Sequence, residues 1–174
     1  PTEHLRPNLN PSENVLAFIE GNEKPNEIIV ISAHYDHLGQ DTYEVYNGAD
    51  DDGSGTVAIM EIAEAFQKAA EKGNGPKRSI LFLHVTGEEK GLLGSKYYTN
   101  YPVFPLINTV ANLNMDMIGR VDDAHENNPN FVYLIGSDKL STELHEISEA
   151  MNEKFTKLSL DYTYNSNDDP NRFY

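Results

Sequence analysis

The sequence predicts an α/β protein in which helices cover both faces of a mixed, mainly parallel central sheet. Short apolar runs, which are typical of strands, alternate along the chain with segments whose apolar residues recur at helical spacing. The first two apolar runs follow each other closely, so we expect them to form an antiparallel hairpin at one edge of the sheet. The chain of 174 residues is long enough for one substantial core, and we expect a single domain over residues 1–174.

The first elements are predicted from turn signals and apolar periodicity. Residues 15–19 and 28–32 are short apolar runs separated by the turn-forming segment GNEKPN, which favours a hairpin. The second run has no polar alternation, as expected of a strand that is covered on both faces. A helix is predicted from about 56 to 72, because its apolar residues recur at helical spacing and glycine-rich segments flank both ends.

The rest of the chain continues the alternation of strands and helices. The further predicted elements are a buried strand at 79–86, a short helix at 92–98, strands at 109–115 and 131–135, a helix at 141–155 and a short strand at 160–164. The last helix is amphipathic, since its apolar side carries Leu144, Ile147, Met151 and Phe155.

The composition excludes several classes of protein. The chain carries 28 Asp and Glu against 13 Lys and Arg, a formal net charge of −15, so it lacks the basic surface that binds nucleic acid or anionic membranes. No apolar stretch approaches the roughly 20 residues that span a bilayer. The absence of cysteine excludes disulfides, cysteine-ligated zinc and a thiol nucleophile. The chain starts at Pro1 without a signal-peptide core, and we expect a mature or trimmed chain of a secreted or periplasmic protein.

Four groups of acidic and histidine side chains lie where predicted strands end or where the first long helix begins. They are His34-Tyr35-Asp36-His37, Asp50-Asp51-Asp52, Glu88-Glu89 and Asp116. The carboxyl ends of parallel strands meet at one edge of a sheet, so these groups should converge. Carboxylates gathered there would repel one another and take up protons unless a divalent cation held them ionised. Imidazole and carboxylate without thiolate favour zinc, and after it manganese or cobalt.

The spacing of these residues indicates individual roles. His34 and Asp36 are two residues apart on an extended segment and point the same way. Asp36 can therefore accept the second ring N–H of His34 while the other ring nitrogen binds metal. Glu88 and Glu89 are adjacent, so their side chains diverge: one can bind metal while the other acts as general base on a metal-activated water.

Four stretches of the sequence resemble, in the same order, the motifs of the M28 family of co-catalytic zinc aminopeptidases. They are His34-Tyr35-Asp36, residues 47–55 (NGADDDGSG), residues 86–95 (TGEEKGLLGS) and residues 114–119 (NMDMIG). The likeness covers about residues 28–119 and is weaker from there to Tyr174. It implies the zinc-exopeptidase (phosphorylase/hydrolase-like) fold of that family, and a cis peptide bond between Asp51 and Asp52.

The resemblance also implies a role for each residue of the predicted centre. It implies that His34 and Asp116 bind a first zinc ion and that Asp51 bridges this ion to a second one. It implies in addition that Glu89 binds the second zinc and that Glu88 is the general base.

In the same family the counterpart of Asp36 supports the metal-binding histidine. The resemblance thus implies an aminopeptidase that hydrolyses the N-terminal peptide bond, with two zinc ions per complete domain and a peptide with a free N-terminus as substrate.

The sequence departs from the family pattern at its C-terminal end. The family takes the last ligand of the second zinc, a histidine, from a C-terminal segment, but no histidine follows His145. His145 itself lies off the apolar side of its predicted helix. We therefore expect a catalytic domain that is truncated at the C-terminus and lacks the last strand or strands and helix. We also expect its second metal to be weakly bound or absent.

Other interpretations stay open at this point. A glutaminyl cyclase or a carboxypeptidase of the same fold would use similar carboxylates, and the missing histidine is compatible with a non-catalytic, metal-stabilised module. The segment from His34 to His37 also resembles part of the metallo-β-lactamase motif, although that motif needs a histidine where Ser32 stands. Among the remaining histidines, the sequence favours a loop residue for His37 and a loop or surface residue for His125. A hydrogen-bonded core position is favoured for His84.

Overall fold

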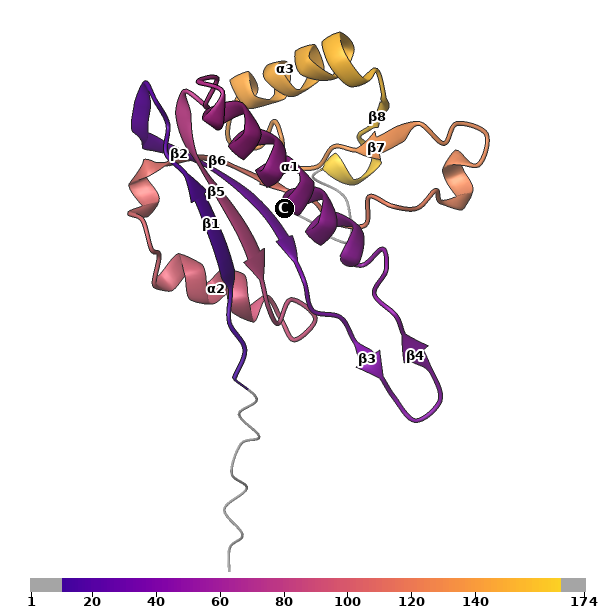
Figure 1. Cartoon of the computed structure of the whole chain (residues 1–174). Helices are drawn as coiled ribbons and strands as arrows, with labels where there is room; N and C mark the ends of the chain where they lie inside the picture. Colours follow the sequence, from indigo (N-terminus) through magenta and orange to yellow (C-terminus); the bar gives the residue numbers. More distant parts are fainter. Residues whose placement is uncertain (1–10, 167–174) are drawn as a thin grey trace, which may run out of the picture. The chain divides into compact units, whose positions relative to one another are not determined.

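The computed structural model describes residues 11–166 of the chain. The chain divides into two compact units, Pro1–Gly119 and Arg120–Tyr174, which are described separately below (Figure 1). This division does not test the expected single domain, which stays a prediction. No helix among the described residues is both long enough and apolar enough to cross a membrane.

The first unit is built on a four-stranded sheet with the order β1-β5-β2-β6. The four strands are β1 (Val15–Ile19), β2 (Lys24–His34), β5 (Arg78–Val85) and β6 (Thr109–Asn114). β2 runs parallel to both of its neighbours, and β1 is antiparallel to β5. The prediction of a mixed, mainly parallel sheet is therefore confirmed.

The predicted pairing of the first two strands is wrong. β1 does not pair with β2, because β5 lies between them and pairs with both. The turn after β1 is tied to the segment that enters β5: the backbone N–H groups of Asn22 and Glu23 donate to the carbonyls of Pro76 and Lys77, at 2.9 and 3.1 Å. The apolar β2 takes a neighbour on each side, β5 and β6, so β1 pairs at an edge of the sheet, on the outer side of β5.

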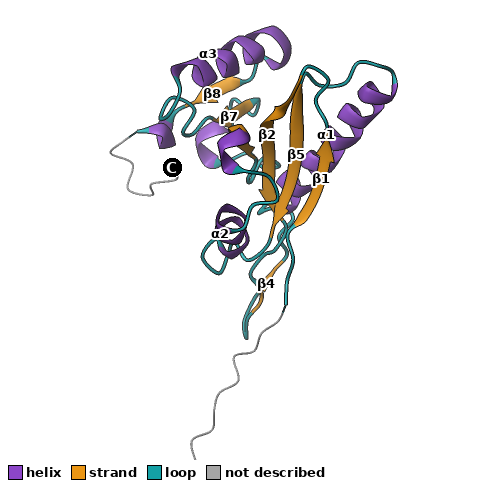
Figure 2. Ribbon diagram, turned by 90° about the vertical axis from the view of Figure 1, so that its left-hand side faces the viewer, coloured by secondary structure: helices purple, strands orange, loops and turns teal. Residues whose placement is uncertain are grey.

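Alternation along β5 builds two apolar layers, one on each face of the sheet. On one face Ile80 and Phe82 pack with Ile59 of α1 (Gly53–Glu71), which is fully buried. On the other face Leu81 and Leu83 pack with Tyr98 of α2 (Leu93–Asn100). Figure 2 shows the two helices on opposite sides of the strands, as predicted for a sheet that is covered on both faces.

Gly55, in the first turn of α1, has no room for a side chain. A Cβ atom added at Gly55 would lie 2.5 Å from Asp52 Oδ1 and 2.6 Å from the carbonyl oxygen of Met115. We expect Gly55→Ala to lower the free energy of unfolding by about 1–3 kcal/mol, because overpacking outweighs the better helix propensity of alanine. The matched control is Gly75→Ala, whose Cβ would lie 3.5 Å from the nearest atom. Urea unfolding of both variants checks the prediction, and equal midpoints would contradict it.

Short elements complete the first unit. A two-stranded antiparallel hairpin, which the sequence did not predict, connects β2 to α1, and a 3-10 turn precedes β6. They are β3 (Gly39–Gln40), β4 (Val45–Tyr46) and the turn Leu106–Asn108.

The second unit contains one parallel strand pair and one longer helix. β7 (Phe131–Tyr133) pairs with β8 (Ser159–Asp161), and α3 (Thr142–Met151) continues into a π-helical turn, Asn152–Thr156. Two 3-10 turns, Asp123–His125 and Thr163–Asn165, flank these elements. Strands and helix appear where the sequence predicted them, with shorter strands.

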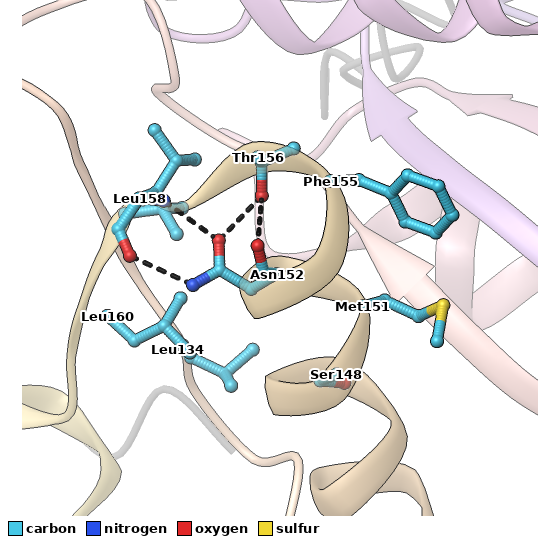
Figure 3. Close-up of a pocket in the computed structure, with 9 residues that line it drawn as sticks. Leu134, Ser148, Met151, Asn152, Phe155, Thr156, Leu158 and Leu160 are labelled. Atoms are coloured by element: carbon cyan, nitrogen blue, oxygen red, sulfur yellow. Dashed lines mark hydrogen bonds between the residues drawn. The ribbon is translucent and has the colours of Figure 1, made fainter.

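An apolar hollow of about 350 Å³ lies between the end of α3 and the strand pair. Figure 3 shows Leu134, Leu160, Met151 and Phe155 around it, with the Asn152 side chain hydrogen-bonded to the backbone of Leu158.

His125 is predicted from the sequence to lie in a loop or at the surface. It is buried at the end of a 3-10 turn, so the predicted surface position is wrong. Its two ring nitrogens lie 2.7 Å from Asp122 Oδ1 and 3.1 Å from Asp161 Oδ2. The ring also stacks on Phe131 with 3.5 Å between ring centroids. The partner carboxylates are 39 residues apart in the sequence, and nothing in its local pattern shows that they meet.

Candidate metal centre

The parallel strands β2, β5 and β6 lead into the acidic and histidine residues that the sequence singled out. His34 is the last residue of β2, Glu88 follows β5 by three residues, and Asp116 follows β6 by two. The loop that leads into α1 adds Asp51, which stands directly before the N-cap residue Asp52. All of these residues belong to the first unit, in which the ends of the strands and the loop before α1 position them.

His34 lies at the centre of the first group of side chains. Its Nε2 atom is 3.0 Å from Asp51 Oδ1 and 3.8 Å from Asp116 Oδ2. The side chain is only 3% exposed, so this nitrogen is held in a fixed direction by the surrounding packing. The predicted approach of these three residues is therefore present in the structure.

The other ring nitrogen of His34 is held differently from the prediction. Nδ1 donates to the backbone carbonyl of Asp36 at 2.9 Å, whereas the Asp36 carboxylate lies 3.7 Å away. That carboxylate instead accepts the backbone N–H of Glu88 at 3.1 Å. Asp36 thus orients the imidazole through its backbone and positions Glu88 through its side chain, an arrangement that residue spacing could not distinguish.

His37, Asp51 and Glu89 form a second group, which the sequence predicted only in part. His37 Nδ1 lies 2.8 Å from Glu89 Oε1 and 3.8 Å from Asp51 Oδ2. The two oxygens of Asp51 therefore face different groups, Oδ1 towards His34 and Oδ2 towards His37. From the sequence, His37 is expected to be a loop residue and not a ligand. The signal that could have identified it is its position one residue after Asp36.

The carboxylates on either side of Asp51 accept hydrogen bonds from the backbone of the centre. Asp52 accepts the N–H groups of His34, Gly55 and Met117 at 3.1, 3.0 and 3.3 Å. Asp50 accepts the N–H of Gly119 at 2.7 Å. Asp52 can also meet His34 and Asp116 in a potential ligand group, but its oxygens are already occupied by backbone donors. The peptide bond between Asp51 and Asp52 is cis, as the resemblance implied.

Three carboxyl groups of the centre have pKa values above their ordinary range. Burial raises the pKa of Asp52 to about 6, and the charge of Asp116 acts in the same direction. Burial likewise raises the pKa of Asp116 and of Glu88, and the nearby charges of Asp51 and Glu89 add to the effect.

The pKa of His34 is the balance of opposing effects. Burial lowers it, but the charge of Asp116, the hydrogen bond to the carbonyl of Asp36 and the charge of Asp52 together place it above its ordinary value. The raised pKa values of Asp52, Asp116 and Glu88 show that a cation placed among these carboxylates would stabilise their charged forms.

The donor set fits a divalent metal ion, and one further observation supports this. Within residues 11–166, two buried side-chain polar atoms have no hydrogen-bond partner, and these are His37 Nδ1 and Glu89 Oε1, which face each other. Two groups, His34 with Asp52 and Asp116, and His37 with Asp51 and Glu89, each bring three potential ligand atoms within 4.8 Å of one another. Imidazole nitrogen and carboxylate oxygen are the ligands that zinc binds in the absence of thiolate.

The remaining histidine of the sheet does not belong to the centre. His84 lies in β5, and its Nε2 atom is 3.1 Å from the carbonyl oxygen of Thr56. This agrees with the hydrogen-bonded core position that the sequence predicted.

Comparison with known proteins assigns the chain to a family. Residues 14–173 match the description "Peptidase family M28". The chain belongs to peptidase family M28. The predicted resemblance is thereby confirmed for almost the whole chain, including the part in which the motifs are weaker.

Two of the similar proteins are described as zinc enzymes that cleave peptides. The structure of a zinc aminopeptidase from Bacillus subtilis matches with a TM-score of 0.64 and 28% sequence identity, over 84% of this chain and 34% of that one. A probable zinc metalloprotease from Pyrenophora teres f. teres (strain 0-1) is 38% identical over 109 residues, 61% of this chain and 22% of the relative. The chain thus spans about a fifth of that relative and a third of the Bacillus aminopeptidase.

Two further matches carry other descriptions. A probable glutamate carboxypeptidase from Arabidopsis thaliana is 39% identical over 83 residues, which are 48% of this chain and 11% of that protein. A glutaminyl cyclase from Bacteroides thetaiotaomicron shares the fold with a TM-score of 0.58 at 19% identity, over 84% of this chain and 55% of that one. Membership of M28 therefore groups the chain with relatives described as a zinc aminopeptidase, a zinc metalloprotease and a carboxypeptidase, and does not by itself distinguish among their reactions.

Proposed function

We propose that this M28 protein is a zinc-dependent aminopeptidase that removes the N-terminal residue from peptides. The observation that carries the proposal is the position of Asp51, whose two carboxylate oxygens face separate groups of ligand atoms around His34 and His37. A carboxylate shared in this way suits a pair of cations at one sheet edge.

Four residues predicted from the sequence would hold the metal. His34 and Asp116 offer ligand atoms on one side of Asp51, and Glu89 offers one on the other side. Zinc bound there would supply Lewis-acid chemistry, polarising the scissile carbonyl and lowering the pKa of a water molecule. The protein's own contribution is the placement of these side chains, of which His34 is buried at the end of β2.

Glu88 is the group that we propose to move the proton. The backbone donors that bind Asp52 do not bind the Glu88 carboxylate. The nearby charges of His34, Glu89 and Asp116 shift its pKa. Burial raises its pKa, which makes it a better proton acceptor than an exposed glutamate. It would take the proton of the attacking water and deliver it to the leaving amine.

The charge of the centre favours a substrate that presents a cation. Carboxylates surround His34, and the whole chain carries a net charge of −15, so a protonated or metal-bound N-terminal amine is attracted where a C-terminal carboxylate is repelled. This is the reason for preferring an aminopeptidase to a carboxypeptidase, the second candidate, which the Arabidopsis relative brings into consideration.

A substrate panel with metal depletion tests the proposal. With zinc, we expect release of the N-terminal residue from peptides with a free amine. N-terminal acetylation should lower this rate by about 100-fold or more, because it removes the cation that the centre attracts. Chelation should abolish turnover, and added zinc should restore it. Equal cleavage of acetylated peptides, or release of the C-terminal residue instead, would contradict the aminopeptidase assignment.

A further inference from the structure

We propose that His37 is a direct ligand, through Nδ1, of the cation that Asp51 and Glu89 would hold. The inference rests on the proposed metal centre and adds to it a residue that neither the sequence motifs nor the comparisons assign. It would give the second cation three protein ligands, where the sequence alone predicted Asp51, Glu89 and water.

The distances support direct ligation. His37 Nδ1 is 2.8 Å from Glu89 Oε1 and 3.8 Å from Asp51 Oδ2, and the three ligand atoms lie within 4.8 Å of one another. Ligand atoms about 2.0–2.2 Å from a shared zinc ion are themselves roughly 3–4 Å apart. One of the two separations, 3.8 Å, lies within this range and the other, 2.8 Å, lies just below it, so a cation fits among the three atoms with small side-chain adjustments.

The hydrogen bonding of the pair supports a cation rather than a simple contact. His37 Nδ1 and Glu89 Oε1 are buried and close, yet they form no hydrogen bond with each other or with any described residue. A buried polar atom without a partner destabilises the folded state, and here two such atoms face each other. A shared metal ion satisfies both atoms at once.

The loop before Asp51 provides a seat for the imidazole. Gly48 has φ +65°, and a Cβ atom at this position would lie 2.8 Å from Cβ and 3.0 Å from Cγ of His37. Only glycine lets the loop backbone pass this close to the histidine. The Tyr46 ring adds an edge contact, with 6.4 Å between ring centroids. The side chain is therefore held in place by the same loop that delivers Asp51.

Cation titration of the whole chain tests the inference without a substrate. Calorimetry with zinc should give two equivalents for the unmodified chain. His37→Ala should keep one equivalent and weaken the other by about 100-fold or more, because even a group that only supports a ligand is worth 10- to 100-fold in affinity. His145→Ala is the matched control, since His145 lies in the second unit beside Ser137 and should leave both equivalents unchanged.

A second measurement covers the case in which His37→Ala does not fold. Long-range ¹H–¹⁵N spectra of the unmodified chain should show the Nδ1 resonance of His37 shifting when zinc is added, with Nε2 remaining protonated. The inference is overturned if that resonance does not move, if His37→Ala binds both equivalents as tightly as the unmodified chain, or if the unmodified chain binds fewer than two. These results are independent of turnover: a chain that binds two cations through His37 but cleaves no peptide would reject the aminopeptidase proposal and keep this one.

Discussion

Glu88→Gln is expected to lower kcat for peptide hydrolysis by about 10²- to 10⁴-fold, the range that a positioned general base contributes. The amide keeps the size and shape of the carboxylate but cannot accept the proton of the attacking water. Glu88 lies beside the ligand groups without belonging to either of them, so its replacement should leave the zinc content unchanged. Steady-state kinetics and elemental analysis of the same preparation check both parts.

The control for charge is Glu20→Gln, an exposed carboxylate just after β1 that loses the same unit of charge. It should retain the full rate. A Glu88→Gln variant with the kcat of the unmodified protein would refute the role of general base. A variant that loses zinc together with activity would show that Glu88 is a ligand instead.

Asp51→Ala is expected to remove both cations, because Asp51 is the residue whose oxygens face both groups. Zinc raises the melting temperature of a protein that binds it only when folded, and this increase should disappear in the variant. Differential scanning calorimetry with and without zinc measures the effect, and Asp123→Ala, an exposed acid in the second unit, is the control.

The stability of the metal-free protein separates a ligand from a structural residue. The charge of Asp51 raises the pKa of both Glu88 and Asp116, so in the absence of metal its removal relieves repulsion. We therefore expect metal-free Asp51→Ala to be at least as stable as the unmodified protein. A metal-free variant that is strongly destabilised, or one that still binds two zinc ions, would contradict the role of shared ligand.

Much of the sheet could be predicted because strand burial leaves a local signal. The uninterrupted apolar run of β2 and the alternation of Leu81 and Phe82 in β5 indicate strands that are covered on two faces, and the structure agrees. The pairing of β1 could not be predicted, since it depends on how the chain after α1 returns to the sheet. A short turn such as GNEKPN suits a hairpin equally well, and only the insertion of β5 excludes it.

The centre was predictable for a related reason. His34, Glu88, Glu89 and Asp116 stand at or just after the carboxyl ends of parallel strands, and this topology brings them together. Details below the level of topology could not be predicted: the carbonyl rather than the carboxylate of Asp36 holds His34, and His37 turns towards Glu89. Both depend on the loop after β2 and on the close approach of Gly48, which leave no periodic pattern in the sequence.

The presence of two cations around Asp51 is best tested by anomalous diffraction at the zinc edge from crystals of the chain grown with zinc. We expect two peaks on either side of the Asp51 carboxylate, one beside His34 Nε2 and Asp116 and one beside Glu89 and His37 Nδ1. A map without any peak at bonding distance from Asp51, or with zinc bound only elsewhere on the molecule, would contradict the metal centre described above.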